Sequence, residues 1–253
     1  MLPSLPIPPS SPDVLWLNLS PRLKHFNLRL LRQLQTQPSL ATTVLGCWDY
    51  HQTLDEPCCF TTALTLLHEA IRGGDRPVHL LGHGSSGLLA LLYAQQYPQW
   101  VRSLTVLSVG AAPAQTWHDH YYALRKLLPC SRSMILAQMV RSLFGPQGYD
   151  LTKRFMKVLA ADLDSALAPH SLGHRTAVAI ADIEPPIWAA IGANDTLLAS
   201  RAVDSLPWLK SSDRLYCLPE GRHFFHYDYP RQVAQEISNF WATVEAPTAL
   251  IAA

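Results

Sequence analysis

Residues 78 to 98 read VHLLGHGSSGLLALLYAQQYP, and this stretch decides the fold. An apolar run leads into Gly82, small residues follow through Gly87, and a segment rich in Ala and Leu continues to Pro98. This order predicts a buried strand that passes through a tight turn into a helix. Glycines suit such a turn because the strand and helix backbones come close together there.

The turn resembles the nucleophile elbow of the α/β-hydrolase family, whose commonest motif reads Gly-His-Ser-x-Gly-Gly ahead of a helix. Gly82 and His83 fit this motif, Gly87 fits its last glycine, and Pro98 ends the helix in register. In this alignment the place of the nucleophilic serine falls on Gly84. The resemblance therefore implies a degenerate nucleophile position, because glycine has no side chain that can attack a substrate.

Two further motifs towards the C-terminus carry the same resemblance. A Pro-x-x-x-x-x-Gly-x-x-Asp pattern ends at Asp195, and a Gly-x-His-Phe pattern contains His223. Both follow predicted strands and match the family's acid and base in the chain order nucleophile, acid, base. The resemblance implies that His223 is the base and that Asp195 holds its imidazole in the useful tautomer. It extends over most of residues 14 to 244.

The resemblance also implies an oxyanion hole beside the turn. Ser85 would supply one backbone N–H, and Leu19 or Ser20, after the first predicted strand, would supply the second. The family's His-Gly pair is absent here, because Asn18 and Leu19 stand in its place. Ser85 is also a fallback nucleophile in a register shifted by one residue, but this shift puts His83 where the family has a small residue.

The rest of the chain alternates predicted strands and helices, which favours an α/β fold with a mostly parallel sheet of about six strands and helices on both faces. Besides the strand before Gly82, strands are expected at 14–18, 42–46, 103–109, 187–191 and 214–218. We predict a single α/β-hydrolase domain at 13–253, with a helical cap inserted at about 115–180. Residues 1–12 hold five of the 20 prolines and predict an extended arm.

The composition excludes several classes of protein. The chain has 253 residues, of which 48% are hydrophobic and 15% charged, as is typical of a well-packed globular domain. Its net charge of +1 creates no field that would attract nucleic acid. No apolar run predicts a transmembrane segment, and the first residues lack a signal-peptide pattern. The five cysteines match no disulfide framework, so we expect reduced thiols in a soluble, cytoplasmic protein.

No metal or cofactor is expected. His118 and His120 bracket Asp119, but the spacing places no third and fourth ligand. Residues two apart on a helix do not share a face, so a polar edge of the cap is the favoured place for these histidines.

Several apolar residues of the chain are candidates for a ligand pocket. Some of Leu124, Met134 and the other apolar cap positions could line a greasy pocket, although for any one of them ordinary packing against the core is the favoured interpretation. Trp16, Trp48 and Trp117 lie beside the predicted pocket loops, with the same two interpretations.

Three functions fit these residues. The leading hypothesis is a catalytically impaired hydrolase homologue that acts as a binding or scaffold protein, with an apolar small molecule under the cap or a protein as its partner. The first alternative is an active serine esterase-type hydrolase that uses Ser85. The second is an enzyme in which His223 and Asp195 act as a general base without a covalent intermediate.

Overall fold

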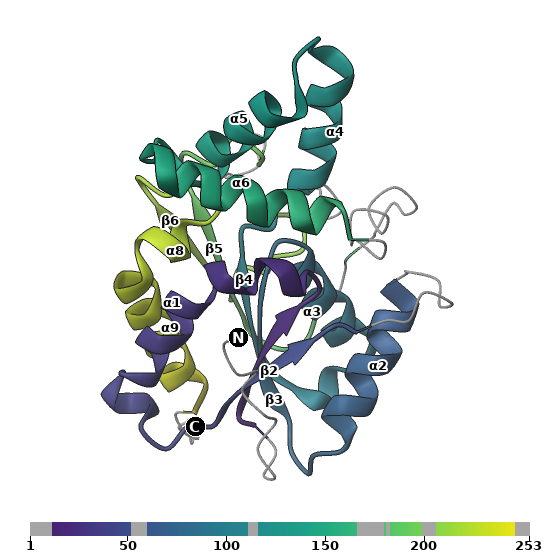
Figure 1. Ribbon diagram of the computed structural model, residues 1–253. Coiled ribbons are helices and arrows are strands. Elements are labelled where there is room, and N and C mark those ends of the chain that lie inside the picture. Colours follow the sequence, from purple (N-terminus) through teal and green to yellow (C-terminus); the bar gives the residue numbers. More distant parts are fainter. Residues whose placement is uncertain are drawn as a thin grey trace, which may run out of the picture.

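The computed structural model describes residues 12–51, 60–110, 116–165, 180, 183–198 and 206–245. Among these residues, six strands form one parallel sheet in the order β2-β1-β3-β4-β5-β6, with helices on both faces (Figure 1). The predicted fold class is confirmed. The proline-rich arm predicted at 1–12 lies, apart from Pro12, outside the described residues.

Strands and helices alternate along most of the chain. The strands are β1 (Val14–Asn18), β2 (Leu45–Asp49), β3 (Val78–His83), β4 (Val101–Leu107), β5 (Ile187–Gly192) and β6 (Arg214–Leu218). The α-helices are α1 (Leu28–Gln35), α2 (Phe60–Arg72), α3 (Ser85–Gln96), α4 (Trp117–Leu127), α5 (Arg132–Phe144), α6 (Tyr149–Leu163), α8 (Phe225–Asp228) and α9 (Pro230–Glu245). Short 3₁₀ helices are η1 (Pro21–Phe26), η2 (Pro38–Leu40) and η3 (Pro98–Trp100). No helix within the described ranges combines the length and apolar composition that are needed to cross a bilayer.

Alternate residues of the strands face opposite helical layers, as the two-residue period of a strand requires. In β1, Leu15 and Leu17 pack in a cluster with residues of α2 and α3. Val14 and Trp16 point to the other face and pack with α1 and α9. Both faces of the sheet are therefore buried, which explains why its strands read as nearly continuous apolar runs.

The start of the second strand differs from the sequence prediction. The strand begins at Leu45 instead of residue 42 and pairs with β1 from Val14 onward. Thr42 and Thr43 are β-branched and favour a strand by composition. They lie instead in the turn after η2, where the N–H of Thr43 donates to the carbonyl of Leu40 at 3.0 Å.

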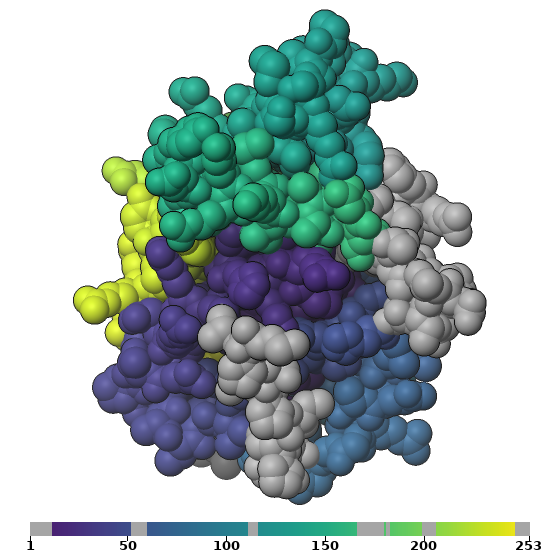
Figure 2. Space-filling view, in the orientation of Figure 1, coloured from purple at the N-terminus to yellow at the C-terminus, as the bar shows by residue number. Residues whose placement is uncertain are grey.

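Residues 116–165 form α4, α5 and α6, which gather at the carboxyl end of the sheet (Figure 1). After β1 the chain forms η1, which lies against α6. The ring of Phe26 in η1 packs 4.6 Å from Phe144 of α5 and 5.1 Å from Phe155 of α6. In the space-filling view this teal and green layer rests on the purple N-terminal segment (Figure 2). Residues 166–179 of the predicted cap lie outside the described residues.

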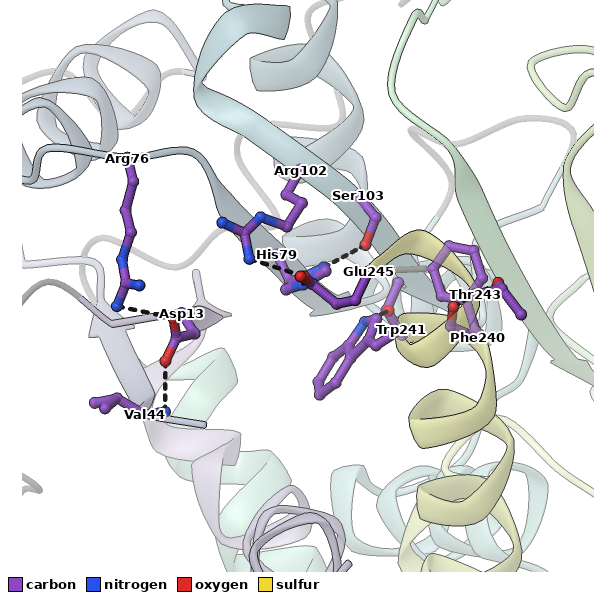
Figure 3. Close-up of polar contacts among 11 residues, drawn as sticks. Asp13, Val44, Arg76, His79, Arg102, Ser103, Phe240, Trp241, Thr243 and Glu245 are labelled. Carbon is purple, nitrogen blue, oxygen red and sulfur yellow. Dashed lines mark hydrogen bonds and ion pairs between the residues drawn. The ribbon is translucent and has the colours of Figure 1, made fainter. Parts of the chain in front are cut away.

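A partly buried polar cluster ties the end of α9 to the amino end of the sheet. The imidazole of His79 is hydrogen-bonded through Nδ1 to Ser103 Oγ (2.7 Å) and through Nε2 to Glu245 Oε1 (3.0 Å) (Figure 3). Arg102 donates a further hydrogen bond to Glu245 at 2.8 Å. Burial lowers the pKa of His79 to about 4. The order serine, histidine, carboxylate is that of a catalytic relay, but Ser103 is 0% exposed and cannot meet a substrate. The cluster therefore anchors the end of α9.

Candidate functional site

The predicted strand, tight turn and helix meet at residues 82–87, which we call the elbow. β3 ends at His83, α3 begins at Ser85, and Gly84 between them has φ 53° and ψ −122°. A Cβ atom on Gly82 would lie 2.6 Å from the backbone of Ser86, so the close approach of strand and helix requires glycine there. The positive φ puts residue 84 in a conformation that is strained for any residue with a side chain.

His223 and Asp195 form a buried pair beside the elbow. Asp195 follows β5, His223 follows β6, and Nδ1 of the histidine lies 2.8 Å from Oδ2 of the carboxylate. The other oxygen of Asp195 accepts the N–H of Leu197 at 3.0 Å. The Nδ1–H of His223 thus points at the carboxylate, which leaves Nε2 to face Gly84. The structure brings these two residues together as the sequence motifs suggested.

Gly84 lies at the open side of this pair. A Cβ atom built on Gly84 would be 4.0 Å from Nε2 of His223. A serine hydroxyl extends about 1.4 Å beyond Cβ, so such a group could come within hydrogen-bond reach of the imidazole. The structure therefore leaves room at residue 84 for a side chain that would reach the imidazole, and glycine supplies none.

Ser86 has a role that the sequence did not reveal. Its hydroxyl accepts the backbone N–H of Leu19 at 3.0 Å, so this amide is already committed. Leu19 is buried away from the cavity at the elbow, whereas Ser20 lines that cavity. Of the two predicted donors after β1, Leu19 thus has an internal partner for its N–H, and Ser20 is the one that lines the cavity. Ser85 also lines the cavity.

The elbow encloses a small cavity of about 40 Å³, which we call the elbow cavity. Its lining comes from Asn18 and Ser20 at the end of β1, Leu23 and Asn27, residues 83–86, residues 116–118, and His223 with Phe224. Among the described residues, the lining contains no aspartate, glutamate, lysine or arginine. Electrostatic recognition in this cavity therefore depends on histidines, hydroxyls, amides and helix ends.

His118 corrects one expectation from the sequence. It is not at a polar edge: it is 1% exposed, lines the elbow cavity, and places Nε2 2.8 Å from Oδ2 of Asp162 in α6. Asp119 instead caps α4 by accepting the N–H of Thr116 at 2.8 Å. In the described part of the chain, no group of three or more potential metal ligands comes together.

Two more buried histidines surround His223. The Nε2–H of His83 donates to the carbonyl of His223 at 2.9 Å, and burial, followed by the neighbouring His226 and His223, holds the pKa of His83 well below its usual value. Burial and the charge of His223 lower the pKa of His226 to about 3. Both side chains are therefore neutral near pH 7.

Asn18 occupies the place of the family's histidine and organises the end of β1. Its Oδ1 accepts from Trp16 Nε1 at 2.8 Å and from Asn27 Nδ2 at 3.1 Å. Its Nδ2 donates to Asp49 Oδ1 at 2.7 Å, and Asn27 Oδ1 accepts from His226 Nε2 at 3.0 Å. This chain of hydrogen bonds fixes the floor of the elbow cavity without any His-Gly motif.

The apolar candidates divide differently from the sequence expectation. Trp117 lines the elbow cavity, whereas Trp16 and Trp48 pack inside the core. Leu124 packs in the cluster of α4, α5 and α6, and Met134 is 62% exposed, so neither lines the cavity. For Leu124 this agrees with ordinary packing, the interpretation that the sequence favoured.

Residues 16–236 match the family model described as "Alpha/beta hydrolase family". The chain therefore belongs to the α/β-hydrolase family, and the resemblance inferred from the sequence is confirmed. It is 39% identical over 244 residues to "Uncharacterized protein sll0249" of Synechocystis sp., with 96% of this chain and 95% of that protein covered.

Solved structures of similar fold include two hydrolases. One is a hydrolase from Pseudomonas aeruginosa PA01, with a TM-score of 0.67, 21% identity, and coverage of 91% of this chain and 90% of that one. The other is a serine hydrolase involved in carbazole degradation, with a TM-score of 0.69, 14% identity and 92% of each chain covered. At these identities the likeness concerns the fold alone.

Proposed function

We propose that this α/β-hydrolase homologue is impaired as a serine hydrolase and binds a small molecule in the elbow cavity without hydrolysing it, beneath a cap formed by α4, α5 and α6. The observation that carries the proposal is the glycine at position 84. A Cβ atom built there would lie 4.0 Å from His223 Nε2, but glycine has no side chain to extend towards the imidazole. Removal of a triad nucleophile typically leaves only about 10³ to 10⁴ of rate enhancement over water. This remaining activity is too low for a useful esterase.

Binding is supported by what remains of the site. The pair of His223 and Asp195 is buried and ordered by hydrogen bonds, and the cavity beside it is enclosed by the cap and the elbow. Buried polar groups are costly unless they are paired, so a site kept for packing alone would favour apolar replacements. A protein that docks on the outer surface of the cap is the other form of a binding role.

Ser85 is disfavoured as a nucleophile. It is the first residue of α3, and within the described chain no hydrogen bond joins its hydroxyl to His223. Nucleophilic catalysis needs the base within hydrogen-bond reach of the attacking group.

A second candidate function has its own supporting observation. Nε2 of His223 has no hydrogen-bond partner among the described residues, while Nδ1 is fixed by Asp195. A histidine held in this way can act as a general base on a substrate proton, or on a water in the gap at Gly84. This enzyme would form no covalent intermediate.

Hydrolysis of p-nitrophenyl butyrate by the native protein, Ser85→Ala and His223→Ala separates the three functions. The binding proposal expects the same rate of ester hydrolysis in all three proteins. That rate should be no higher than the background caused by nonspecific reaction of the ester with the protein surface. A rate that falls at least tenfold in both variants would instead identify a hydrolase that uses Ser85. A fall in His223→Ala alone would identify the general-base enzyme. Circular dichroism of each variant checks that the fold is retained.

We also propose a cytoplasmic location. It is supported by Cys47, Cys130 and Cys217, which are free thiols in the described part of the chain.

A further inference from the structure

The elbow cavity contains a buried hydrogen-bond donor that has no acceptor. Trp117, the first residue of α4, lines the cavity and is only 4% exposed, and its Nε1 finds no hydrogen-bond partner. Other tryptophans behave differently, because the indole N–H of Trp208 donates to the carbonyl of Gly110 and that of Trp241 donates to Thr105. A buried donor without an acceptor is destabilising, so its presence in a cavity points to an acceptor supplied by a ligand.

The same cavity receives the amino end of α3. This helix has 12 residues, begins at Ser85, and has no side chain that caps its first turn. Its first backbone N–H groups lack acceptors within the helix and carry partial positive charge, which favours an anion. The amino end of α4 contributes no such charge, because Asp119 already caps it through Thr116.

His223 supplies the third contact. Its Nε2 faces the gap at Gly84 and can share a proton with an oxygen atom placed there, because Nδ1 is held by Asp195. Three kinds of hydrogen-bonding group therefore belong to residues that line one cavity: an indole N–H, helix amides and an imidazole.

The size and the walls of the cavity limit the ligand. A volume of about 40 Å³ has room for roughly three water-sized groups, since one such group takes about 10–15 Å³. No lysine or arginine lines the cavity among the described residues, which disfavours a phosphate dianion. Leu23 and Phe224 offer an apolar wall for one or two carbons.

We infer that the elbow cavity binds a short-chain monocarboxylate of the size of acetate or propionate, with its oxygens on Trp117 Nε1, the first amides of α3 and His223 Nε2. This inference rests on the proposed function, because it takes the gap left by Gly84 as the place of the carboxylate. A ligand of about four heavy atoms cannot bind tighter than tens of micromolar, so a dissociation constant between about 0.1 and 5 mM is expected.

Indole N–H resonances provide a direct test with the full chain. The seven tryptophans give seven indole signals in a ¹H–¹⁵N spectrum, and Trp117→Phe identifies the signal of Trp117. Sodium acetate is titrated against acetamide, a neutral molecule of the same shape, at constant ionic strength with sodium chloride. Trp208→Phe is the matched control, because it removes an indole donor outside the elbow cavity.

Acetate is expected to shift the Trp117 signal saturably and to bind at least tenfold tighter than acetamide. Trp117→Phe should weaken acetate binding, measured by calorimetry, by tenfold or more, and Trp208→Phe should leave it unchanged. The absence of a saturable shift up to about 100 mM acetate, or equal binding of acetamide, would overturn the inference. The saturable shift of an indole signal is measured in the native protein, so the affinity for acetate is obtained even if Trp117→Phe folds poorly.

The outcome is separable from that of the proposed function. Failure to bind acetate together with equal ester hydrolysis in the native protein, Ser85→Ala and His223→Ala rejects the carboxylate and leaves the impaired hydrolase standing. Ester hydrolysis that depends on Ser85 rejects the proposed function whatever acetate does.

Discussion

Gly84 and His223 face each other at the carboxyl end of β3, where a Cβ atom on the glycine would lie 4.0 Å from Nε2 of the imidazole. The relationship combines a backbone shaped for a nucleophile, with φ 53°, and a histidine oriented by Asp195. On the proposed function, the side chain that Gly84 lacks is what separates this site from a complete triad.

The strain of the elbow predicts the stability of a serine variant. Gly84→Ser should unfold with a free energy lower by about 1–3 kcal/mol, because a residue with a Cβ is strained at this φ. Gly148→Ser is the matched control, since Gly148 has φ −59° and a Cβ there would meet nothing within 4 Å. Urea titrations measure both variants. Equal or greater stability of Gly84→Ser would contradict the role given to glycine.

The hydrogen bond between Ser86 and Leu19 predicts a contrast between neighbouring serines. Ser86→Ala leaves the Leu19 N–H buried without its acceptor and should cost about 1–3 kcal/mol of unfolding free energy. Ser85→Ala should change stability by less than about 0.5 kcal/mol, because its hydroxyl has no such bond in the described structure. The account of Ser86 fails if the two variants are equally stable in urea.

The buried pair of His118 and Asp162 should hold α4 against α6. Asp162→Ala removes the acceptor of a buried hydrogen bond to a charged group and should cost about 1.5–3 kcal/mol. Asp164→Ala removes an exposed ion pair with Arg132 from the same region and should cost at most about 1 kcal/mol. Thermal and urea unfolding measure the stability of the two variants. A similar loss of unfolding free energy in both would show that the buried pair contributes no more than the exposed one.

Buried neutral histidines predict that stability falls in acid. The pKa of His79 is lowered to about 4 and that of His226 to about 3, both by burial, so the unfolded state binds their protons first as pH falls below about 6.5. Their contribution to stability is present above pH 6.5 and is lost as pH approaches 4 to 3. Asp228 acts in the opposite sense, because burial raises its pKa to about 6 and the folded state holds its proton between about pH 4 and 6.

Urea titrations at pH 7, 6, 5 and 4 measure the balance of these groups. The free energy of unfolding should decrease from pH 6.5 to pH 4, by up to about 1.4 kcal/mol per pH unit for each histidine. His226→Gln can keep the hydrogen bond to Asn27. It should reduce the slope by the contribution of one titrating group, up to about 1.4 kcal/mol per pH unit. An unchanged slope in His226→Gln would show that His226 is not held neutral by the fold.

The sequence predicted the parts of the fold that depend on local pattern. Strands β1 and β6, the turn at Gly84 and the helix after it follow from apolar runs and glycines that are adjacent in the chain. The approach of Asp195 to His223 was predictable only through the family motifs, since it depends on two loops 28 residues apart.

The remaining features depend on contacts that no spacing encodes. His118 and Asp162 lie 44 residues apart on different helices, so helical periodicity could not pair them. The bond from Leu19 to Ser86 spans 67 residues and joins the end of one strand to a neighbouring helix. Start positions such as that of β2 were misplaced because Thr42 and Thr43 have strand composition, and turn hydrogen bonds outweigh it.

Covalent labelling by a fluorophosphonate, located by mass spectrometry of peptides, tests the central claim that Gly84 stands at the nucleophile position of an otherwise formed site. The account predicts no labelling of the native protein, labelling of the new serine in Gly84→Ser, and loss of that labelling when His223→Ala is added. Labelling of the native protein on Ser85, abolished in Ser85→Ala, would contradict the account and make this chain a working serine hydrolase.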